Sequence, residues 1–466
     1  MLKSKYNSLV KNIGLFTIGS FGSKIVSFLM VPLYTAVLST SDYGTVDLVS
    51  STAQLLMPIL ILSIQDATLR FSMDSKYKKS DVMSTTVNVI LKGSFVLVIG
   101  ILIVRISGIF SLDSSYYIFL ILLFIFGSLN NCFNLYLKAK NNASIIVVSG
   151  ILSTFITCVS NIVLLVVFTM GVNGYMVSNV VGLLLSVIYQ LFIGKIYKDI
   201  HLKNYNNLSK IMIRYSIPLI SNSIAWWVNY TSDRYILTYI CGVAINGIYS
   251  VAYKIPTILT TFQSIFYNAW SISAISEYDK NDTDGFIGNN YTLYSCVSIL
   301  ICSILLLLNI SLATILYSGE YFVAWQSVPF LLVGTVLNGI AQFEGCLFAA
   351  TKKTKAVSQT TVIGALLNIV CNFIFIYFWG AVGAAFSTML GYGTTWILRT
   401  IYLRRFIDMK VNWTKHAILI ASIIVQAVLA TFNVLNVLQV LIFIVILLLH
   451  KEYIRRLFKS GIIKIK

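Results

Sequence analysis

Long apolar stretches alternate with short polar segments along the whole chain. A membrane-spanning helix needs roughly 20 mostly apolar residues, and hydropathy divides this chain into fourteen stretches of that order. The expected spans are residues 12–38, 43–70, 83–106, 116–137, 144–170, 174–196, 211–240, 246–275, 290–316, 322–350, 356–379, 382–402, 415–433 and 436–454. The segments between them are too short for a soluble domain, so the pattern predicts an all-α polytopic membrane protein.

The basic residues are concentrated in alternate segments between the spans. The chain has 34 Lys and Arg against 16 Asp and Glu, which gives a net charge of +18. With the N-terminus in the cytoplasm, all but four of the basic residues fall on inner segments. The exceptions are Lys24, Arg105, Arg234 and Lys254. This distribution follows the positive-inside rule and predicts that both termini are cytoplasmic. It also accounts for the charge without a nucleic-acid partner.

The composition agrees with a membrane protein and excludes other classes. Hydrophobic residues make up 58% of the chain and charged residues 11%, which is more apolar surface than a soluble chain of 466 residues could bury. The seven cysteines lie in apolar stretches without CxxC spacing, so we expect small core residues and no metal or disulfide role. No GxxxxGK[ST] motif occurs, which excludes an ATP-driven motor of that type within the chain.

The second half of the chain weakly repeats the first. Gly44, at the start of the second span, matches Gly247 at the start of the eighth. A second match, 209 residues apart, pairs Gly174, Ser178 and Gly182 with Gly383, Ser387 and Gly391. Each half then holds six spans entered from the same side, which predicts two bundles related by an axis along the membrane normal.

The repeat predicts three parts. The N-lobe, residues 1–205, contains spans one to six, and the C-lobe, residues 206–408, contains spans seven to twelve. Residues 409–466 contain spans thirteen and fourteen and a basic cytoplasmic tail, and they lie outside the repeat.

The first expected helix has a polar stripe with a cation midway along it. Its residues follow steps of three and four and therefore share one face: Thr17, Ser20, Lys24 and Ser27. A cation at that depth costs on the order of 3 kcal/mol on insertion scales, so it needs an anionic or wet neighbour. Either Lys24 pairs with Asp66 inside the bundle, or it faces a water-filled path.

Lys24 is one of four cations expected within or at the edge of the spans. Arg70 lies near the inner edge, whereas Arg234 and Lys254 lie roughly 10 Å below the outer surface. These residues belong to the first two helices of each half, which we expect to line a cleft between the lobes. A cationic cleft would attract phosphate or carboxylate cargo. The alternative is a set of separate ion pairs, such as Arg70 with Asp66.

A group of oxygen-bearing side chains is expected at one depth in the second half. Asp233, Asn372 and Thr388 fall roughly 10 Å below the outer surface by residue count, and Asn368 lies one turn from Asn372. A carboxylate with amide and hydroxyl oxygens suits Na⁺, a hard cation, and could equally relay protons. The alternative is ordinary hydrogen bonding between helices.

Aromatic residues crowd the seventh and eighth spans. Tyr230 and Tyr253 lie deep enough to offer a sugar ring an apolar face and a polar tip, whereas Tyr239 and Trp270 fit the interfacial aromatic belt. Glu344, toward the inner end of the tenth span, is expected to pair with nearby basic residues.

The opening of the chain resembles that of a known transporter family. The residues that carry the likeness are Asn12, Lys24, Pro32-Leu33-Tyr34, Leu38-Ser39-x-x-Asp42-Tyr43-Gly44 and Asp66-Ala67-x-x-Arg70-Phe71. They resemble the Wzx-like polysaccharide flippases of the multidrug/oligosaccharidyl-lipid/polysaccharide exporter superfamily. The resemblance covers spans one to twelve and is strongest over residues 12–71.

The resemblance implies two six-helix lobes in a V arrangement and no catalytic residues. It implies alternating access that carries an undecaprenyl-diphosphate-linked oligosaccharide across the bacterial cytoplasmic membrane for polysaccharide biosynthesis. Its cofactor would be no more than a coupling ion, Na⁺ or H⁺. Its partners would be the lipid-linked oligosaccharide, membrane lipids and a polysaccharide polymerase. The residues that would meet the diphosphate or an acidic sugar are Lys24, Arg70, Arg234 and Lys254.

Three other functions remain as alternatives. A multidrug exporter of the same superfamily would need an acidic, aromatic cleft for cationic drugs, which four cations disfavour. Lipid II flippases share the extra pair of spans but carry further cations on the first helix, where this chain has only Lys24. A polysaccharide polymerase or ligase would need a long outer loop with catalytic basic residues, and no such loop is expected here.

Overall fold

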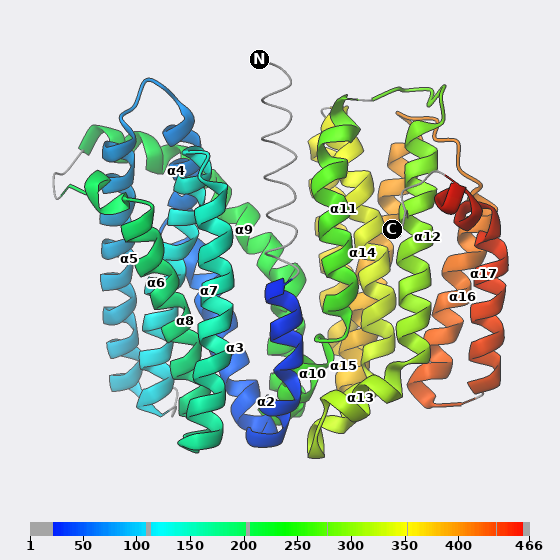
Figure 1. Cartoon of the computed structure of the whole chain (residues 1–466), viewed down its shortest axis with the longest axis horizontal. Helices are drawn as coiled ribbons and strands as arrows, with labels where there is room; N and C mark the ends of the chain where they lie inside the picture. Colours follow the sequence, from blue (N-terminus) through cyan, green and yellow to red (C-terminus); the bar gives the residue numbers. More distant parts are fainter. Residues whose placement is uncertain are drawn as a thin grey trace. The chain divides into compact units, whose positions relative to one another are not determined.

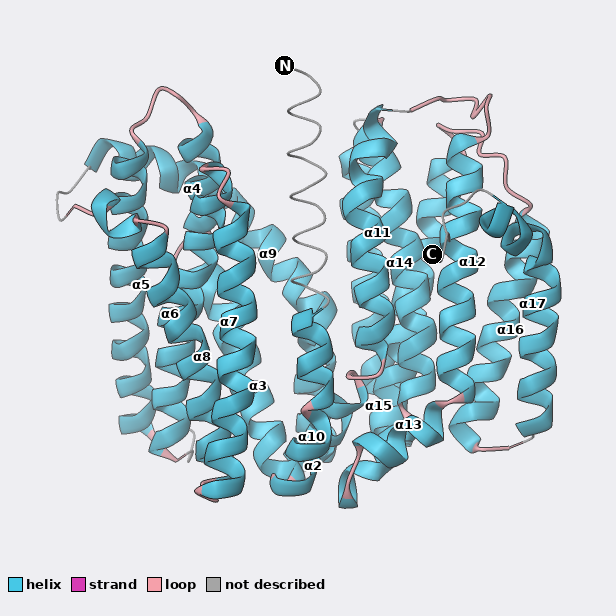
Figure 2. Ribbon diagram, viewed as in Figure 1, coloured by secondary structure: helices cyan, strands magenta, loops and turns pink. Residues whose placement is uncertain are grey.

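The computed structural model describes residues 22–108, 113–201, 206–276, 278–351, 353–434 and 436–459. These residues form helices joined by loops, without a strand among them (Figures 1 and 2). The chain divides into two compact units, Met1–Ser232 and Asp233–Lys466. The division falls inside helix α9, Asn206–Cys241, which begins where the C-lobe was predicted to begin. The lobe boundaries at 205 and 408 stay predictions.

The first unit is built from the helices that precede Asp233. They are the helix Gly22–Val37 with its second part α2 (Val31–Val37), α3 (Thr40–Leu60), α4 (Ile64–Met73), α5 (Lys79–Ser107), α6 (Ser114–Ala139), α7 (Ala143–Ile162), the π-helix η1 (Val163–Val167), α8 (Gly171–Ile193), the 3₁₀-helix η2 (Ile196–Asp199) and the first part of α9. Helix α6 is central, because it packs against α3, α4, α5, α7 and α8.

Two features of the opening motif have local structural causes. Ser39 caps α3 by accepting a hydrogen bond from the Asp42 backbone amide at 3.1 Å, and its hydroxyl donates to the Asp42 carboxylate at 2.7 Å. Such a cap satisfies a backbone amide that the helix itself leaves open. Beyond Pro58 the chain turns through Ser63, whose φ is 49°, and α4 continues at 54° to α3.

A buried amide joins three helices of the first unit. The Gln190 side chain of α8 is fully buried and donates to Asn130 Oδ1 of α6 at 2.9 Å and to Ser149 Oγ of α7 at 2.9 Å. Polar groups buried between helices need such partners, because no water reaches them there. This network therefore holds α6, α7 and α8 in one arrangement.

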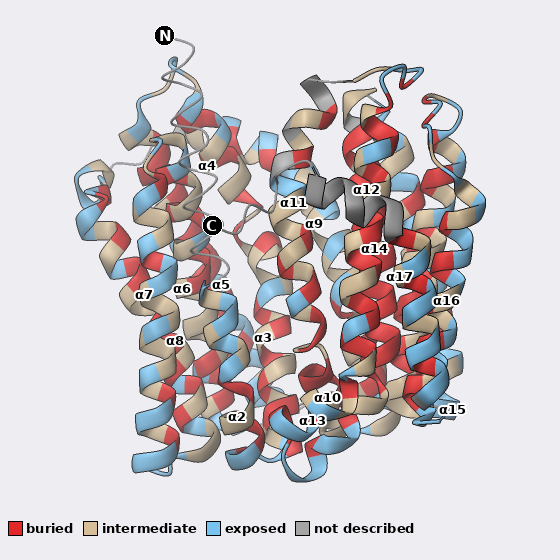
Figure 3. Cartoon of the chain, turned by 45° about the vertical axis from the view of Figure 1, so that its right-hand side comes forward, coloured by how far each residue is buried: buried red, intermediate tan, exposed pale blue. Residues whose placement is uncertain are grey.

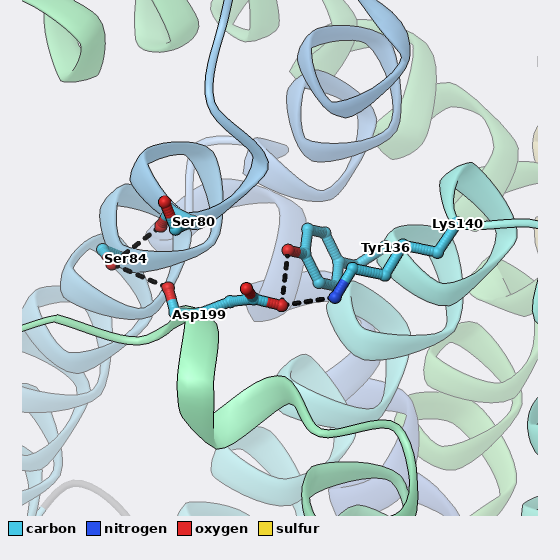
Figure 4. Close-up of polar contacts among 5 residues, drawn as sticks. All are labelled: Ser80, Ser84, Tyr136, Lys140 and Asp199. Atoms are coloured by element: carbon cyan, nitrogen blue, oxygen red, sulfur yellow. Dashed lines mark hydrogen bonds and ion pairs between the residues drawn. The ribbon is translucent and has the colours of Figure 1, made fainter.

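Asp199 ties the segment after α8 back onto the unit (Figure 4). Its carboxylate pairs with Lys140 and accepts a hydrogen bond from the Tyr136 hydroxyl at 2.9 Å. Its backbone carbonyl accepts from the Ser84 hydroxyl at 3.0 Å. These contacts join η2 to α5 and to the end of α6 immediately before the chain enters α9.

The second unit is built from the end of α9 and the helices that follow. They are α10 (Val243–Ala252), α11 (Pro256–Ser276), α12 (Phe286–Leu307), α13 (Asn309–Leu316), the 3₁₀-helix η3 (Gly319–Gln326), α14 (Val328–Ala350), α15 (Thr354–Leu403), α16 (Trp413–Phe432) and α17 (Asn436–Lys459). Helix α14 is buried along most of its length (Figure 3), because α11, α12, α15 and α16 all pack against it.

Helix α15 folds back on itself at Gly380. The backbone there has φ 53° and ψ −128°, which divides the 50 residues of α15 into two halves. The halves run antiparallel, since Gly383 packs against the backbone at Phe375 and Gly391 packs against Asn368. Glycine permits this close approach because it has no side chain.

The two matched Gly-Ser-Gly motifs have the same local structure in their separate units. The Ser178 hydroxyl donates to the Gly174 carbonyl at 2.8 Å, and the Ser387 hydroxyl donates to the Gly383 carbonyl at 2.8 Å. The last glycine of each motif lies against the preceding helical segment: Gly182 against Ser153 and Gly391 against Gly364.

The number of spans stays a prediction. Every expected span overlaps helical residues of the described chain. By length and composition, eight helices of that part of the chain could cross a membrane, or nine with the bent pair α3–α4. Helix α9 fails this test, and it carries Asp233 and Arg234 near its end; α10 has only ten residues. The all-helical membrane architecture is clear, whereas the count of fourteen exceeds what composition alone supports.

Gly391 provides a test of the α15 hairpin. A methyl group added there would lie 2.7 Å from Asn368 Cβ, so we expect Gly391→Ala to destabilise the protein by about 1–3 kcal/mol through overpacking. Gly100→Ala is the matched control, because nothing lies within 4 Å of the added methyl. Thermal unfolding in detergent measures both variants. Equal unfolding temperatures would show that the two halves do not pack as described.

Candidate functional site

Lys24 is exposed on the helix Gly22–Val37. Among the described residues neither Lys24 nor Asp66 takes part in an ion pair, so the structure does not form the alternative Lys24–Asp66 pair. Ser27, one turn further along the helix, lines a cavity. Thr17 and Ser20, the other members of the predicted stripe, lie outside the described residues.

The cavity beside Ser27 lies within the first unit and has a volume of about 290 Å³. Residues of the first helix, α6, α7 and α8 line it: Val26, Ser27, Met30, Tyr34, Leu123, Ser153, Thr154, Thr157, Cys158, Asn179 and Leu183. Its size is close to the lower end of small-molecule sites. Its wall combines apolar surface with hydroxyl and amide groups, which is a surface suited to a sugar.

Asn161 forms hydrogen bonds to two residues that line this cavity. Its side-chain nitrogen donates to the Tyr34 hydroxyl at 3.1 Å and to the Thr157 carbonyl at 2.8 Å. Its Oδ1 is buried and has no hydrogen-bond partner among the described residues. This site was not predicted from the sequence, although Ser153, Thr157 and Asn161 recur every fourth residue and so share one face of α7.

Arg70 is exposed in the last turn of α4. Like Lys24, it has no ion pair among the described residues, so the alternative Arg70–Asp66 pair is not formed either. No contact in the described chain joins Arg70 to Lys24. The two predicted cations of the first unit are therefore separate positive charges on different helices.

Asp233 is the centre of a polar cluster in the second unit. The side chain is 3% exposed. Its Oδ2 accepts hydrogen bonds from Tyr249 at 2.6 Å, from Tyr253 at 3.2 Å and from Thr388 at 3.4 Å. Its Oδ1 accepts from the Arg234 backbone amide at 2.9 Å. The structure thus brings together two of the residues predicted for the ion site, Asp233 and Thr388.

The other two residues predicted for the ion site bond to each other. Asn372 donates from Nδ2 to Asn368 Oδ1 at 3.0 Å, and its own Oδ1 is buried without a hydrogen-bond partner among the described residues. Nothing in the described structure bonds this pair to Asp233.

The turn at Gly380 sets Asn372 at the level of Asp233. Cys241 lies beside Ile376 and Gly380, at the end of α9 and the turn of α15. Asn372 and Thr388 are eight residues on either side of Gly380, and Asp233 is eight residues before Cys241. At about 1.5 Å per residue each lies about 12 Å from that turn. The three side chains therefore share one level.

Arg234 and Tyr253 meet in the same cluster. The Arg234 guanidinium lies over the Tyr253 ring at 5.5 Å, within cation–π distance. Lys254 follows Tyr253 in the break between α10 and α11 and is half-buried. Tyr230, by contrast, is exposed and stacks on Trp226 at 5.7 Å.

Tyr249 is a functional candidate that the sequence analysis did not single out. Its hydroxyl makes the shortest contact to the Asp233 carboxylate, and its ring packs edge-on against Tyr253 at 5.2 Å. Its spacing in the sequence could have indicated this role, because Tyr249 and Tyr253 are four residues apart and share a helix face.

Sequence comparison supports the resemblance seen in the opening motif. The chain matches a family described as polysaccharide biosynthesis protein over residues 9–270 and 246–423. It is 23% identical over 288 residues to the "Probable low-salt glycan biosynthesis flippase Agl15" of Haloferax volcanii, covering 60% of each chain. It is 25% identical over 334 residues to an uncharacterized membrane protein of Methanocaldococcus jannaschii, covering 68% of this chain and 62% of that protein. The chain thus spans less than two thirds of either relative.

Solved structures share the fold. The lipid II flippase MurJ in an inward closed conformation superposes with a TM-score of 0.68 at 14% identity, over 95% of this chain and 99% of MurJ. An inward-facing multidrug resistance MATE family transporter of the MOP superfamily superposes with a TM-score of 0.63 at 13% identity, over 82% of this chain and 94% of the transporter. At these identities the likeness shows the all-helical fold of MATE transporters and MurJ.

Proposed function

Since the chain belongs to the polysaccharide biosynthesis protein family, we propose that it is a flippase for a lipid-linked oligosaccharide. Its cargo is an undecaprenyl-diphosphate-linked repeat unit, which it moves across the cytoplasmic membrane toward polysaccharide assembly. A polysaccharide polymerase then receives the product. The family match supports the glycan pathway, and the named flippase among the relatives supports translocation as the step.

The observation that carries the proposal is the cation Lys24, which lies one helical turn before Ser27, a residue of the polar cavity. Lys24 has no ion pair among the described residues, and it lies on the helix that supplies Ser27, Met30 and Tyr34 to the cavity. An intramembrane cation is costly, so a protein retains it for an anionic ligand. A diphosphate has several oxygens that accept charge-assisted hydrogen bonds, the strong class of hydrogen bond.

The cavity gives a reason to choose a glycan over an apolar cargo. Hydroxyl and amide groups of Ser27, Thr154 and Asn179 line it beside the Tyr34 ring. Sugars combine polar edges with apolar ring faces, so such a wall matches both. Arg70, Arg234 and Lys254 would meet the diphosphate at other stages of transport, while Tyr230 and Tyr253 would contact sugar rings.

Transport by alternating access would use fourteen spans arranged as two six-helix lobes in a V with an additional helix pair. Both termini would be cytoplasmic, as the positive-inside distribution favours. Cations distributed over several helices suit a cargo that is handed between faces, because one tight trap would slow its release.

Ion coupling is part of the proposal. Asp233, Asn368, Asn372 and Thr388 would hold Na⁺, and the unpartnered Asn372 Oδ1 fits this use because hard cations bind carbonyl and carboxylate oxygens. The ion would neutralise the Asp233 carboxylate. Tyr249 and Tyr253 donate hydrogen bonds to that carboxylate. One of these hydrogen bonds would break when the ion binds, which would leave a carboxylate lone pair for the ion.

A multidrug exporter or a lipid II flippase is the competing function. The MATE and MurJ structures share the fold at 13% and 14% identity, and that likeness does not choose among cargoes. A cationic drug would require an acidic group near Lys24. Asp66 is the acidic residue that the sequence suggested as a partner of Lys24, and the two form no ion pair in the described structure.

Lys24 provides the main test of the cargo. We expect Lys24→Ala to lower export of the lipid-linked oligosaccharide at least tenfold, because one hydrogen bond to a charged group contributes about 1.5–3 kcal/mol. Lys24→Arg should retain a measurable part, since the charge remains. Proteoliposomes loaded with fluorescent undecaprenyl-diphosphate oligosaccharide measure the transfer, and immunoblotting measures insertion.

Lys24→Met is the deciding control, because it roughly preserves side-chain length and removes the charge. Normal export by an inserted Lys24→Met protein would contradict a role for the charge in cargo binding.

Asp233 provides the test of ion coupling. We expect Asp233→Asn to weaken transport and to remove its stimulation by Na⁺, because the amide lacks the negative charge that would attract the ion. Asp113→Asn is the matched control at an exposed aspartate. Transport is measured with Na⁺ or choline outside at constant pH. Unchanged Na⁺ stimulation in Asp233→Asn would leave the cluster as a packing network.

A further inference from the structure

Glu344 is a fully buried carboxyl group in α14, in the centre of the second unit. The sequence predicted pairing with nearby basic residues, and that expectation is wrong in one respect: Glu344 has no ion pair among the described residues. Arg399 and Arg404 act on it only electrostatically. The Arg399 guanidinium instead donates to the Ala341 carbonyl at 2.5 Å and to the Thr361 hydroxyl at 2.8 Å.

The hydrogen bonds of Thr400 suit both protonation states of Glu344. Thr400 Oγ1 lies 2.7 Å from Glu344 Oε1 and 3.0 Å from the Trp396 carbonyl, but the hydroxyl has one hydrogen for two acceptors. An ionised Glu344 accepts that hydrogen. A Glu344 protonated on Oε2 still accepts that hydrogen on Oε1, and one protonated on Oε1 donates to Thr400, which then donates to the Trp396 carbonyl. Thr400 therefore accommodates either state without rearrangement.

Glu344 lies near a line of groups that can pass a proton. Glu344 Oε2 has no hydrogen bond of ordinary length among the described residues, although the Tyr291 hydroxyl is near enough to interact with the carboxyl. Tyr291 Oη lies 3.3 Å from His416 Nε2. The Trp396 indole donates to the same hydroxyl at 3.3 Å. The Tyr291 hydrogen is thus available to Glu344 or to His416.

A small cavity lies at the other end of this line. His416 lines it with Asn412, Lys415 and His450, and its volume of about 20 Å³ is enough for one water molecule. Asn412 is exposed, so the cavity lies next to the surface of the unit. Tyr291 and His416 therefore lie between this cavity and the neighbourhood of the buried Glu344 carboxyl group.

We propose that Glu344 is a proton-binding site that exchanges protons with solvent through Tyr291 and His416. In the inward step, His416 gives the proton on Nε2 to Tyr291 Oη while Tyr291 gives its own proton to Glu344 Oε2. Before this transfer, a hydronium ion in the cavity protonates His416 on Nδ1 and becomes water. Tyr291 ends unchanged, and His416 ends as the neutral Nδ1–H tautomer. The outward step is the reverse.

The neighbouring charged groups determine what one proton changes. Arg399 and Arg404 of the α15 end face Glu344, Tyr291 faces it from α12, and α11 contributes the aromatic Trp270, whose indole bonds to the Phe343 carbonyl. Lys415, His416 and His450 surround the cavity on α16 and α17. Protonation of Glu344 removes its negative charge, which attracts Arg399. The interior of the unit then becomes more positive by one charge.

This inference deepens the proposed function, because it adds a proton site to ion-coupled transport and a role for α16 and α17. Helix α16 packs on α12 and α14 and brings His416 to Tyr291, while α17 brings His450 to the cavity. The link to transport rests on the proposed function, whereas proton binding itself is independent of any cargo.

Infrared spectroscopy of the purified full chain tests the site. The chain has four glutamates, Glu277, Glu320, Glu344 and Glu452, so ¹³C-glutamate labelling isolates few groups. We expect a pH-dependent, isotope-shifted carbonyl band of a protonated carboxylic acid that is shielded from water. It should be absent from Glu344→Gln and retained in Glu320→Gln, the control at an exposed glutamate.

A labelled wild-type protein without this band would overturn the proposal, whether or not Glu344→Gln folds. A band that persists in a folded Glu344→Gln protein would also overturn it, because another glutamate would then bind the proton.

The route is tested by the rate at which the band responds to a pH jump. Tyr291→Phe keeps the ring that packs on Phe343 but removes the hydroxyl. We expect it, and His416→Gln, to slow the response at least about tenfold, which corresponds to about 1.4 kcal/mol in the barrier. The amplitude of the band should remain. An unchanged rate in both variants would overturn the relay.

Transport measurements distinguish a failure of this inference from a failure of the proposed function. Export by the wild type that changes with pH, and export by Glu344→Gln that does not, would support coupling. A Glu344 band in a protein that exports nothing would contradict the flippase while leaving the proton site intact. Export with the same pH dependence in both proteins would overturn the coupling.

Discussion

A polar group inside a bilayer finds no water, so the protein or its ligand must satisfy it. Most of this fold follows from that requirement. Gln190 shares its amide among three helices, and Arg399 places its guanidinium on carbonyl and hydroxyl oxygens. The informative cases are oxygens without hydrogen bonds in the described chain, on Asn161, Asn372 and Glu344. In the proposals above, the cargo would bind beside Asn161, a cation beside Asn372 and a proton on Glu344. Other buried oxygens of the described chain, such as Gln190 Oε1, also have no hydrogen bond, so the proposed roles of these three rest on their neighbours.

Local features could be predicted from the sequence, because they depend on neighbours in the chain. Ser39 and Asp42 form a helix cap within four residues, and Pro58 precedes the bend between α3 and α4. The matched level of Asp233, Asn372 and Thr388 also followed from counting, since helices have a constant rise. Partners depend on rotation about each helix axis, which hydropathy does not report. For that reason Tyr249, the hydrogen bonds of Asn161 and the groups near Glu344 appeared only in the structure.

The charged residues fall into two kinds. Lys24 and Arg70 are exposed and form no ion pair in the described chain, so their charges are available to an anionic ligand. Asp233 and Glu344 are buried and surrounded by hydroxyl groups of tyrosine and threonine. Hydroxyl groups both donate and accept, so they follow a change in protonation or in a bound ion without moving far. The available cations suit a large anionic cargo, whereas the enclosed carboxylates suit small ions.

The shared local structure of the two Gly-Ser-Gly motifs allows one position of the first unit to be compared with one of the second. Asn179 follows Ser178 just as Thr388 follows Ser387, so the predicted repeat makes Asn179 and Thr388 equivalent positions. Asn179 now lines the open cavity of the first unit, and Thr388 donates to the Asp233 carboxylate in the second. Two positions that the predicted repeat pairs thus have different surroundings, a cavity in the first unit and a closed polar cluster in the second. The proposed roles in cargo binding and in ion coupling would then fall on equivalent positions of the two units.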